Sequence, residues 1–441
     1  MTAFRSRRVV RPGGTRPADV VVQAGRIDAI EPFGSVSDPG LIDLGELALL
    51  PGLVDTHVHV DEPGRTSWEG FATATKAAAA GGVTTLIDMP LNCLPPTTTV
   101  ESLAAKRAAA EPKIHVDVGF WGGAAGGDLG DLEKLHAGGV FGFKAFLSPS
   151  GVPEFGHLVG AALDETLAET ARLGALCIVH AEAPEVIDAA PAAAGPTYAR
   201  FLASRPPEVE HAAVARLIEA ARRTSARVHV VHVSSAGVLP LIAAARSENV
   251  AITAETCPHY LFLTAADIAD GDTSAKCCPP IREAANRDAL WLGLASGVID
   301  VVVSDHSPCP PELKTADFAT AWGGVAGLQV GLPAVWTQAK QRGFGLTDVA
   351  RWMSTGPAAL AGLVAKGAIE IGRDADLVAF APDAEFVVDA AQLHHRHANT
   401  PYAGRAMSGV VHATWLRGEL VDGQAPRGQL LERRGDDAHV A

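Results

Sequence analysis

The feature that most restricts the fold of this chain is a repeated alternation of apolar and helical segments. Repeated βα units of this kind favour a barrel. The alternative is an open doubly wound sheet, for which a Gly-x-Gly-x-x-Gly motif after a strand would be evidence. The glycines of Gly122–Gly127 do not have that spacing, so they do not support the open sheet. The sequence predicts an α/β fold, a (β/α)8 TIM-like barrel. Its expected strands are the eight apolar runs Leu49–Val58, Val83–Met89, Ile114–Phe120, Phe141–Leu147, Ala175–His180, Val228–His232, Ala251–Thr256 and Asp300–Ser304.

Both ends of the chain have strand-like sequence outside this alternation. Asp19–Ile30 contains two apolar runs separated by a glycine turn, which is typical of a hairpin. Ala375–Ala381 and Gly409–Val421 have the same character. We therefore expect residues 1–50 and 365–441 to form one small β-sandwich domain, and residues 51–364 to form the barrel.

Two helix boundaries are marked in the sequence. Thr66–Glu69 has the pattern of a capping box, and Gly81-Gly82 is a strong signal for a helix end. Thr98–Glu101 repeats the start signal. These patterns predict one helix from about Thr66 to Gly81 and a second one that begins near Thr98.

Composition excludes several classes of function. The 441 residues carry a net charge of −14 and no long Lys/Arg tract, so we expect no binding to nucleic acid. No signal-peptide apolar region and no uninterrupted apolar run of ~18 residues occur, so we expect a cytoplasmic protein without a membrane span. No cysteines are spaced as Cys-x-x-Cys, which predicts reduced, mostly buried thiols at Cys93, Cys177, Cys257, Cys277, Cys278 and Cys309.

Chemically reactive side chains cluster where the predicted strands end. His57 and His59 are two residues apart and therefore face the same side of their strand. Because the carboxyl ends of barrel strands meet at one mouth, we expect these side chains to converge there. The full set at the strand ends is His57, His59, Lys144, His180, His232 and Asp305.

Imidazole and carboxylate groups are ligands for Zn²⁺ and for Mn²⁺, Co²⁺ or Fe²⁺. A lysine buried beside metal ions should lose its proton, and the neutral amine can then take up CO2 as a bridging carbamate. The hypothesis is a site for two divalent metal ions with a hydroxide between them and with Lys144 as N6-carboxylysine. His57, His59 and Asp305 would hold one ion, His180 and His232 the other. Asp305 would transfer a proton from the nucleophile to the leaving nitrogen; an ordinary salt-bridged lysine is the alternative for Lys144.

Other histidines have simpler interpretations. His229 is an odd number of residues from His232, and His306 directly follows Asp305, so we expect both to point away from the site. His394–His397 could bind a metal as a tract, but its polar surroundings favour a solvated loop.

These motifs resemble the cyclic-amide group of the amidohydrolase superfamily, which includes dihydroorotases, hydantoinases (dihydropyrimidinases) and allantoinases. The resemblance extends over nearly the whole chain, and it implies a binuclear metal barrel, usually with Zn²⁺, a carboxylated lysine and a homotetramer. Several stretches resemble the allantoinase branch, namely His57–Thr66, Lys144–Phe155, Ser304–Lys314, Trp322–Gln329 and Thr400–Gly404. Relatives in this branch usually have cysteine after the strand lysine, whereas this chain has Ala145.

The resemblance implies hydrolysis of (S)-allantoin to allantoate in purine and ureide nitrogen catabolism. The alternatives are a hydantoinase of broader cyclic-imide specificity and a non-catalytic assembly protein of the same fold. Dihydroorotases carry an arginine where this chain has Asp61, whose carboxylate we expect to disfavour an anionic ring. The resemblance also implies ring contacts from Asn92, Ser148, Cys278 and Gly323.

Overall fold

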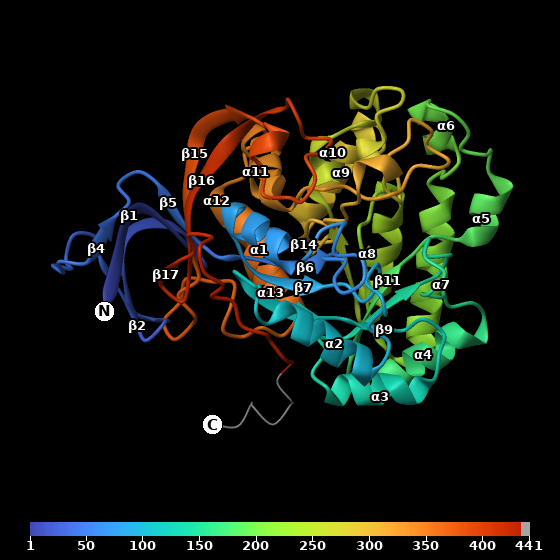
Figure 1. The fold of residues 1–441 in the computed structure, drawn as a ribbon, viewed down its shortest axis with the longest axis horizontal. Helices are drawn as coiled ribbons and strands as arrows, with labels where there is room; N and C mark the ends of the chain where they lie inside the picture. The colour runs from blue at the N-terminus through green and yellow to red at the C-terminus, as the bar shows by residue number, and fades with distance from the viewer. Residues whose placement is uncertain (434–441) are drawn as a thin grey trace.

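The computed structural model describes residues 1–433 and has an α/β fold with two parts (Figure 1). One part is a terminal sheet that contains strands from both ends of the chain, as the sequence predicts. Its strands follow the order β17-β16-β15-β5-β1-β2-β3, with β4 paired to β1. Their bounds are β1 Thr2–Arg11, β2 Gly14–Gln23, β3 Arg26–Pro32, β4 Leu41–Asp43, β5 Ala48–Pro51, β15 Leu377–Val387, β16 Ala406–Leu416 and β17 Glu419–Leu420.

Hydrogen bonds connect all eight of these strands into one sheet, where we expected a sandwich. Phe4 on β1 and Trp415 on β16 are three strands apart in the sheet, ~14 Å if it were flat. Their ring centroids are nevertheless 5.0 Å apart. The sheet therefore curls over its own apolar core, which Val20, Leu49 and Leu377 complete.

The other part has parallel strands alternating with helices. One set has the order β6-β7-β8 and the other β14-β13-β12-β11-β10-β9, and the pairings within both sets are parallel. The bounds are β6 Leu53–Val58, β7 Val83–Asp88, β8 Asp117–Phe120, β9 Gly122–Gly123, β10 Phe143–Phe146, β11 Leu176–His180, β12 Arg227–Val230, β13 Ile252–Thr256 and β14 Val301–Val302. Seven of the eight predicted apolar runs contain one of these strands, and β12 overlaps the eighth, Val228–His232, but begins one residue before it.

Hydrogen bonds also join the two parallel sets at both of their edges. Phe141 N donates to Phe120 O at 3.0 Å, which links the β8 side to the β10 side. At the other edge, Val58 and His306 form an isolated parallel bridge, and His59 N donates to His306 O at 2.8 Å. The segment after β14 is therefore held beside the end of β6.

The helices lie around these parallel strands, and the long strands β15 and β16 run alongside α11 (Figure 1). Within residues 1–433, no helix is both long enough and apolar enough to cross a membrane. The helices are α1 Phe71–Ala80, α2 Val100–Ala110, α3 Leu129–Ala137, α4 Ala161–Arg172, α5 Pro184–Ala189, α6 Tyr198–Ala203, α7 Glu208–Thr224, α8 Leu239–Ser247, α9 Pro258–Phe262, α10 Ala284–Ser296, α11 Gly331–Gln341, α12 Leu346–Ala350 and α13 Gly356–Leu360.

The first predicted strand, Leu49–Val58, is divided between the two parts. β5 pairs with β1 and β15 of the terminal sheet, whereas β6 pairs with β7. Gly52 lies at the division, and a Cβ atom there would lie 2.1 Å from Thr84 Oγ1. The prediction of one continuous barrel strand is wrong because the backbone changes sheets at this close approach.

The two predicted helix starts have different outcomes. α2 begins close to the predicted start, but its capping box pairs Thr99 with Ser102 and not Thr98 with Glu101. α1 begins at Phe71 rather than at the Thr66 pattern, and Phe71 N donates to Glu62 Oε2 at 2.9 Å. The Glu69 carboxylate, which the predicted capping box would have used, instead accepts a hydrogen bond from Arg396 N.

A network of buried charges joins the terminal sheet to the amino ends of the parallel strands. Lys366 Nζ lies 2.6, 2.9 and 2.7 Å from carboxylate oxygens of Asp117, Asp374 and Asp376. Arg417 also contacts Asp117, at 2.7 Å. Every charge in this network therefore has an opposite partner.

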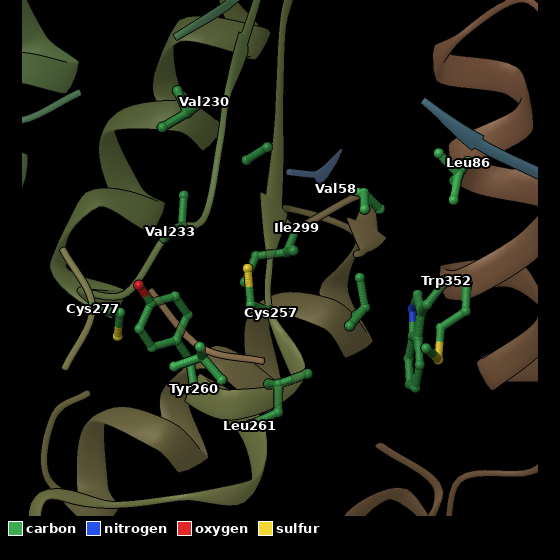
Figure 2. Packing of buried hydrophobic residues seen from close by; sticks show 14 of the residues in the cluster. Val58, Leu86, Val230, Val233, Cys257, Tyr260, Leu261, Cys277, Ile299 and Trp352 are labelled. Atoms are coloured by element: carbon green, nitrogen blue, oxygen red, sulfur yellow. The ribbon is translucent and has the colours of Figure 1, made fainter. Parts of the chain in front are cut away.

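The largest apolar cluster fills the space between the parallel strands and their helices. Figure 2 shows part of it, with Val58, Val230 and Trp352 from separate elements and with Cys257 among apolar side chains. All six cysteines are free, and Cys278 is the only one of them that is not buried. The prediction of reduced, mostly buried thiols is confirmed.

Candidate metal centre

His57, His59 and Asp305 form a compact group of ligand atoms. Asp305 Oδ1 lies 3.1 Å from His57 Nε2 and 3.4 Å from His59 Nε2, and all three residues are buried. β6 ends at Val58, so the two histidines lie at its carboxyl end, and Asp305 follows β14. The three ligand atoms lie within 4.8 Å of one another, which suits one divalent ion.

A second pair of nitrogen atoms lies beside this group. His180 at the end of β11 and His232 just after β12 approach with Nδ1 and Nε2 2.9 Å apart. Burial lowers the pKa of His180, and it holds the pKa of His232 well below its usual value. Neutral imidazoles present the lone pairs that a metal requires.

Lys144 on β10 is buried and lines the same cavity. Within residues 1–433, its ammonium has no hydrogen-bond or ion-pair partner, although it lies 5.0 Å from the centre of the Phe146 ring. Burial lowers the pKa of Lys144 to about 8. The alternative interpretation of Lys144 as an ordinary salt-bridged lysine is therefore not supported, because no salt bridge forms within residues 1–433.

Glu255 on β13 supports the site and was missed in the sequence analysis. One oxygen, Oε1, contacts His57 Nδ1 and accepts a bond from His232 N at 3.2 Å. The other, Oε2, lies 2.9 Å from His229 Nε2. The expectation that His229 points away from the site is wrong, because this buried carboxylate connects it to His57. A glutamate inside an apolar strand was the available signal.

Glu182 was missed in the same way. It lies two residues after His180, and its Oε2 is 2.8 Å from His180 Nε2 and 2.5 Å from Arg205 Nη1. Carboxylates that bind the second nitrogen of a ligating histidine fix the orientation of its ring. Glu182 and Glu255 thus orient one histidine in each of the two groups.

The histidine tract His394–His397 differs from its prediction at one residue. His395 is buried rather than solvated, and its ring centroid is 4.8 Å from that of His306. His306 faces away from the cavity as expected, and its Nδ1 accepts a bond from Gly327 N at 3.2 Å. The other residues of the tract lie in a loop, as predicted, with His394 and Arg396 exposed.

A cavity of about 360 Å³ opens above the two ligand groups. Asn92, Cys278 and Gly323 line it, as the resemblance implied. Ser148 is buried outside the lining, and its neighbours Pro149, Ser150 and Gly151 take its place. Arg205 and Lys276 add positive charge to the wall.

Asp61 is not part of this wall. It is buried with neither carboxylate oxygen hydrogen bonded, and burial together with Asp88 and Glu69 raises its pKa well above the usual value. The expectation that Asp61 repels an anionic ring is therefore unsupported, since its carboxyl group does not line the cavity.

A further set of potential ligand atoms, from Cys257, His259 and Asp305, shares the aspartate with the first group. Burial raises the pKa of the Cys257 thiol well above its usual value, and it lowers the pKa of His259 to about 4. The apolar packing of Cys257 in Figure 2 fits a small core side chain better than a thiolate ligand.

The base of the cavity thus combines two histidines with an aspartate, a neighbouring pair of histidines, and the unpaired amine of Lys144. Such a donor set suits divalent-metal hydrolysis of a small polar molecule.

Comparison with known proteins agrees with this chemistry. Residues 48–421 match the model of the amidohydrolase family. The chain is 60% identical to the allantoinase of Streptomyces avermitilis over 98% of both chains. It is 42% identical to the allantoinase of Arabidopsis thaliana over 95% of this chain and 87% of the other.

Solved structures show the same architecture. L-hydantoinase (dihydropyrimidinase) from Arthrobacter aurescens superimposes with a TM-score of 0.90 at 32% identity, covering 98% of this chain and 97% of that one. Dihydropyrimidinase from Brevibacillus agri gives a TM-score of 0.89 at 30% identity, with 98% of both chains covered. The chain belongs to the amidohydrolase family, and its relatives within that family place it beside the allantoinases.

Proposed function

We propose that this protein is an allantoinase, which hydrolyses the ring amide of (S)-allantoin to allantoate in purine nitrogen catabolism. The observation that carries the proposal is the 60% identity with the Streptomyces avermitilis allantoinase, which extends over 98% of each chain. The cavity of about 360 Å³ fits a small polar ring.

The proposal includes a closed (β/α)8 barrel at residues 51–364, with residues 1–50 and 365–441 forming the small domain. The bonds at both edges of the parallel strands support closure. The sheet change at Gly52 supports the first boundary.

Two divalent metal ions, with Zn²⁺ as the family default, fit the donor atoms of this site. His57, His59 and Asp305 would hold one ion and His180 and His232 the other, with Lys144 as N6-carboxylysine between them. The unpaired amine and its lowered pKa support carbamate formation, because CO2 reacts with the neutral amine. When bound, the ions would supply Lewis acidity for the activation of water and of the ring carbonyl.

The chain's own residues then bind the ring and move a proton. Asp305 is placed to accept the proton of the nucleophile, because it is buried at the base of the cavity and nearby His57 holds its pKa well below its usual value. Asp305 would pass this proton to the leaving ring nitrogen. Asn92, Cys278 and the Gly323 backbone would contact the ring.

A homotetramer acting in the cytoplasm completes the proposal. The family resemblance supports the tetramer, and the free thiols of all six cysteines support a reducing compartment.

The test compares ring-opening rates of the full chain, loaded with metal in bicarbonate, on allantoin, hydantoin, dihydrouracil and dihydroorotate. We expect kcat/KM for allantoin to exceed the others by at least ~10²-fold. Equal or higher values on hydantoin or dihydrouracil would contradict allantoinase function.

The second candidate is a hydantoinase of broader specificity, which the TM-score of 0.90 to L-hydantoinase favours. Comparable rates on hydantoin and dihydrouracil would select it. A non-catalytic assembly role is disfavoured because all six proposed ligand side chains converge.

A further inference from the structure

The segment Ala319–Gly324 forms one wall of the cavity, and two lysines outside it hold its backbone. Lys314 Nζ donates to Trp322 O at 2.9 Å and to Gly324 O at 2.6 Å. Lys276 Nζ donates to Ala321 O and, at 3.5 Å, to Ala319 O. The two ammonium groups thus bind four carbonyl oxygens of one short segment.

Neither lysine has the partner that a sequestered ammonium usually has. Within residues 1–433, no carboxylate lies within ion-pair distance of either Nζ atom. Lys276 is buried and Lys314 half-buried, and burial lowers the pKa of both, that of Lys314 to about 8. Sequestering two cations without a carboxylate partner costs stability, and Lys276 has in addition only the Phe201 ring, 5.6 Å from its ammonium. The charge-assisted bonds from both lysines fix the backbone of the segment.

These bonds leave one peptide group in the segment unused. Trp322 N donates to Leu313 O at 2.8 Å, and Gly324 N donates to Lys276 O at 2.7 Å. Gly323 N–H and C=O, in contrast, have no hydrogen-bond partner anywhere in the described chain. Because glycine has no side chain, its backbone is what lines the cavity.

The backbone next to Gly323 is also constrained by a close approach between Gly324 and Ser307. Gly324 has φ +146°, and a Cβ atom there would lie 2.2 Å from Ser307 O. A Cβ atom at Gly323 would meet only Cys278 Sγ, at 3.9 Å. The segment is therefore clamped at Gly324, while Gly323 faces open space with a free donor and a free acceptor.

We propose that Lys276 and Lys314 are positioning residues that hold Trp322 and Gly324 so that the Gly323 peptide binds the edge of a cyclic amide. An adjacent N–H and C=O on the protein complement an adjacent C=O and N–H on the ring. This inference rests on the proposed function, because it assumes that the ligand is a cyclic amide.

The experiment measures kcat and KM for allantoin with Lys314→Met and Lys276→Met in the full-length, metal-loaded enzyme. Lys340→Met is the matched control, since Lys340 is an exposed lysine that pairs with Asp383. We expect KM to rise ~10- to 100-fold in each test variant, with a smaller change in kcat, because a shifted peptide no longer matches the ring. The metal content per chain should equal that of the control.

A second readout separates positioning from general destabilisation. Hydantoin and an N-methylated hydantoin are compared as competing ligands, because the methyl group removes a ring N–H. The wild-type enzyme should prefer the unmethylated ring, and Lys314→Met should reduce that preference. Lys314→Arg keeps a cationic donor and should restore part of it.

Unchanged KM and unchanged methyl discrimination in folded Lys314→Met and Lys276→Met would overturn the inference. Loss of kcat together with loss of metal would also overturn it. If the lysine variants do not fold, Gly323→Ala, which has room for its methyl group, must raise KM alone. If the wild-type enzyme opens hydantoin but not allantoin, the proposed function fails, and the same KM comparison on hydantoin decides the role of the lysines.

Discussion

Two buried lysines in this protein have opposite environments. Lys366, at the junction with the terminal sheet, contacts three aspartates, and their charges raise its pKa against the effect of burial. Lys144, at the carboxyl end of β10, has no ionic partner in the described chain, and burial lowers its pKa to about 8.

On the proposed function, the difference separates Lys366, whose charge stabilises the fold, from Lys144, whose amine reacts. A paired ammonium is fixed in its protonated form and joins two parts of the fold. An unpaired amine with a lowered pKa can react in its neutral form. Lys144 lies among four histidines and an aspartate, so a carbamate formed there would be placed to bind metal. On the proposed function, the same residue type performs two tasks, according to what surrounds it.

The largest effect should follow from removing the chemical lysine. Lys144→Ala should lower kcat/KM by ~10³-fold or more, because both the carbamate and its metal contacts are lost. Metal content should also fall, and short carboxylates added to the variant should restore part of the activity. Metal analysis and steady-state kinetics would check this result, and full activity would refute a chemical role for Lys144.

Removing the structural lysine should change stability rather than chemistry. Lys366→Met removes the cation that Asp117, Asp374 and Asp376 share, although Asp117 keeps its contact with Arg417, and it should lower the free energy of unfolding by about 3–5 kcal/mol. Denaturant unfolding measures this, and kcat per folded molecule should stay near wild type. A Lys366→Met variant with unchanged stability and reduced kcat would contradict the structural role of Lys366.

A smaller effect should arise at the carboxylates that orient the histidines. Glu255→Gln should weaken metal affinity by ~10- to 100-fold, because Glu255 fixes the His57 ring. Competition with a chelator measures this change. Glu385→Gln on the terminal sheet is a matched control, and equal affinities in the two variants would show that Glu255 has no orienting role.

The smallest effect is expected at Asp61, a buried carboxylate close to the site but outside the cavity lining. Burial raises the pKa of Asp61 well above the usual value and so disfavours its charged form, which an Asp61→Asn amide does not have. The free energy of unfolding should change by less than about 1 kcal/mol. The rate ratio between allantoin and dihydroorotate should also stay constant, whereas a gain of dihydroorotate activity would restore the role in charge repulsion that its sequence position suggested.

The sequence predicted well which side chains meet at the strand ends, because periodicity decides which side of a strand a residue faces. His57 and His59 share a face by spacing alone, and a βα alternation brings strand ends together. The terminal sheet was predictable in outline for the same reason. Its curling, and the change of sheets at Gly52, depend on contacts with residues distant in the sequence.

Glu255, Glu182 and His229 show where prediction from periodicity ends. Their roles come from neighbours across strands or in connecting loops, and the sequence does not state which side chains meet there. His395 was assigned to solvent because its segment is polar, yet it packs on His306. In each case the deciding contact joins residues whose spacing along the chain carries no signal.

Isotopic labelling of the carbamate tests the contrast between the two lysines most directly. The metal-loaded enzyme would be equilibrated with ¹³C-bicarbonate and its carbamate carbon measured by NMR. We predict about one labelled carbon per chain in the wild-type enzyme and in Lys366→Met, and none in Lys144→Ala. A metal-loaded, active wild-type enzyme without a labelled carbamate, or a label that persists in Lys144→Ala, would contradict the account.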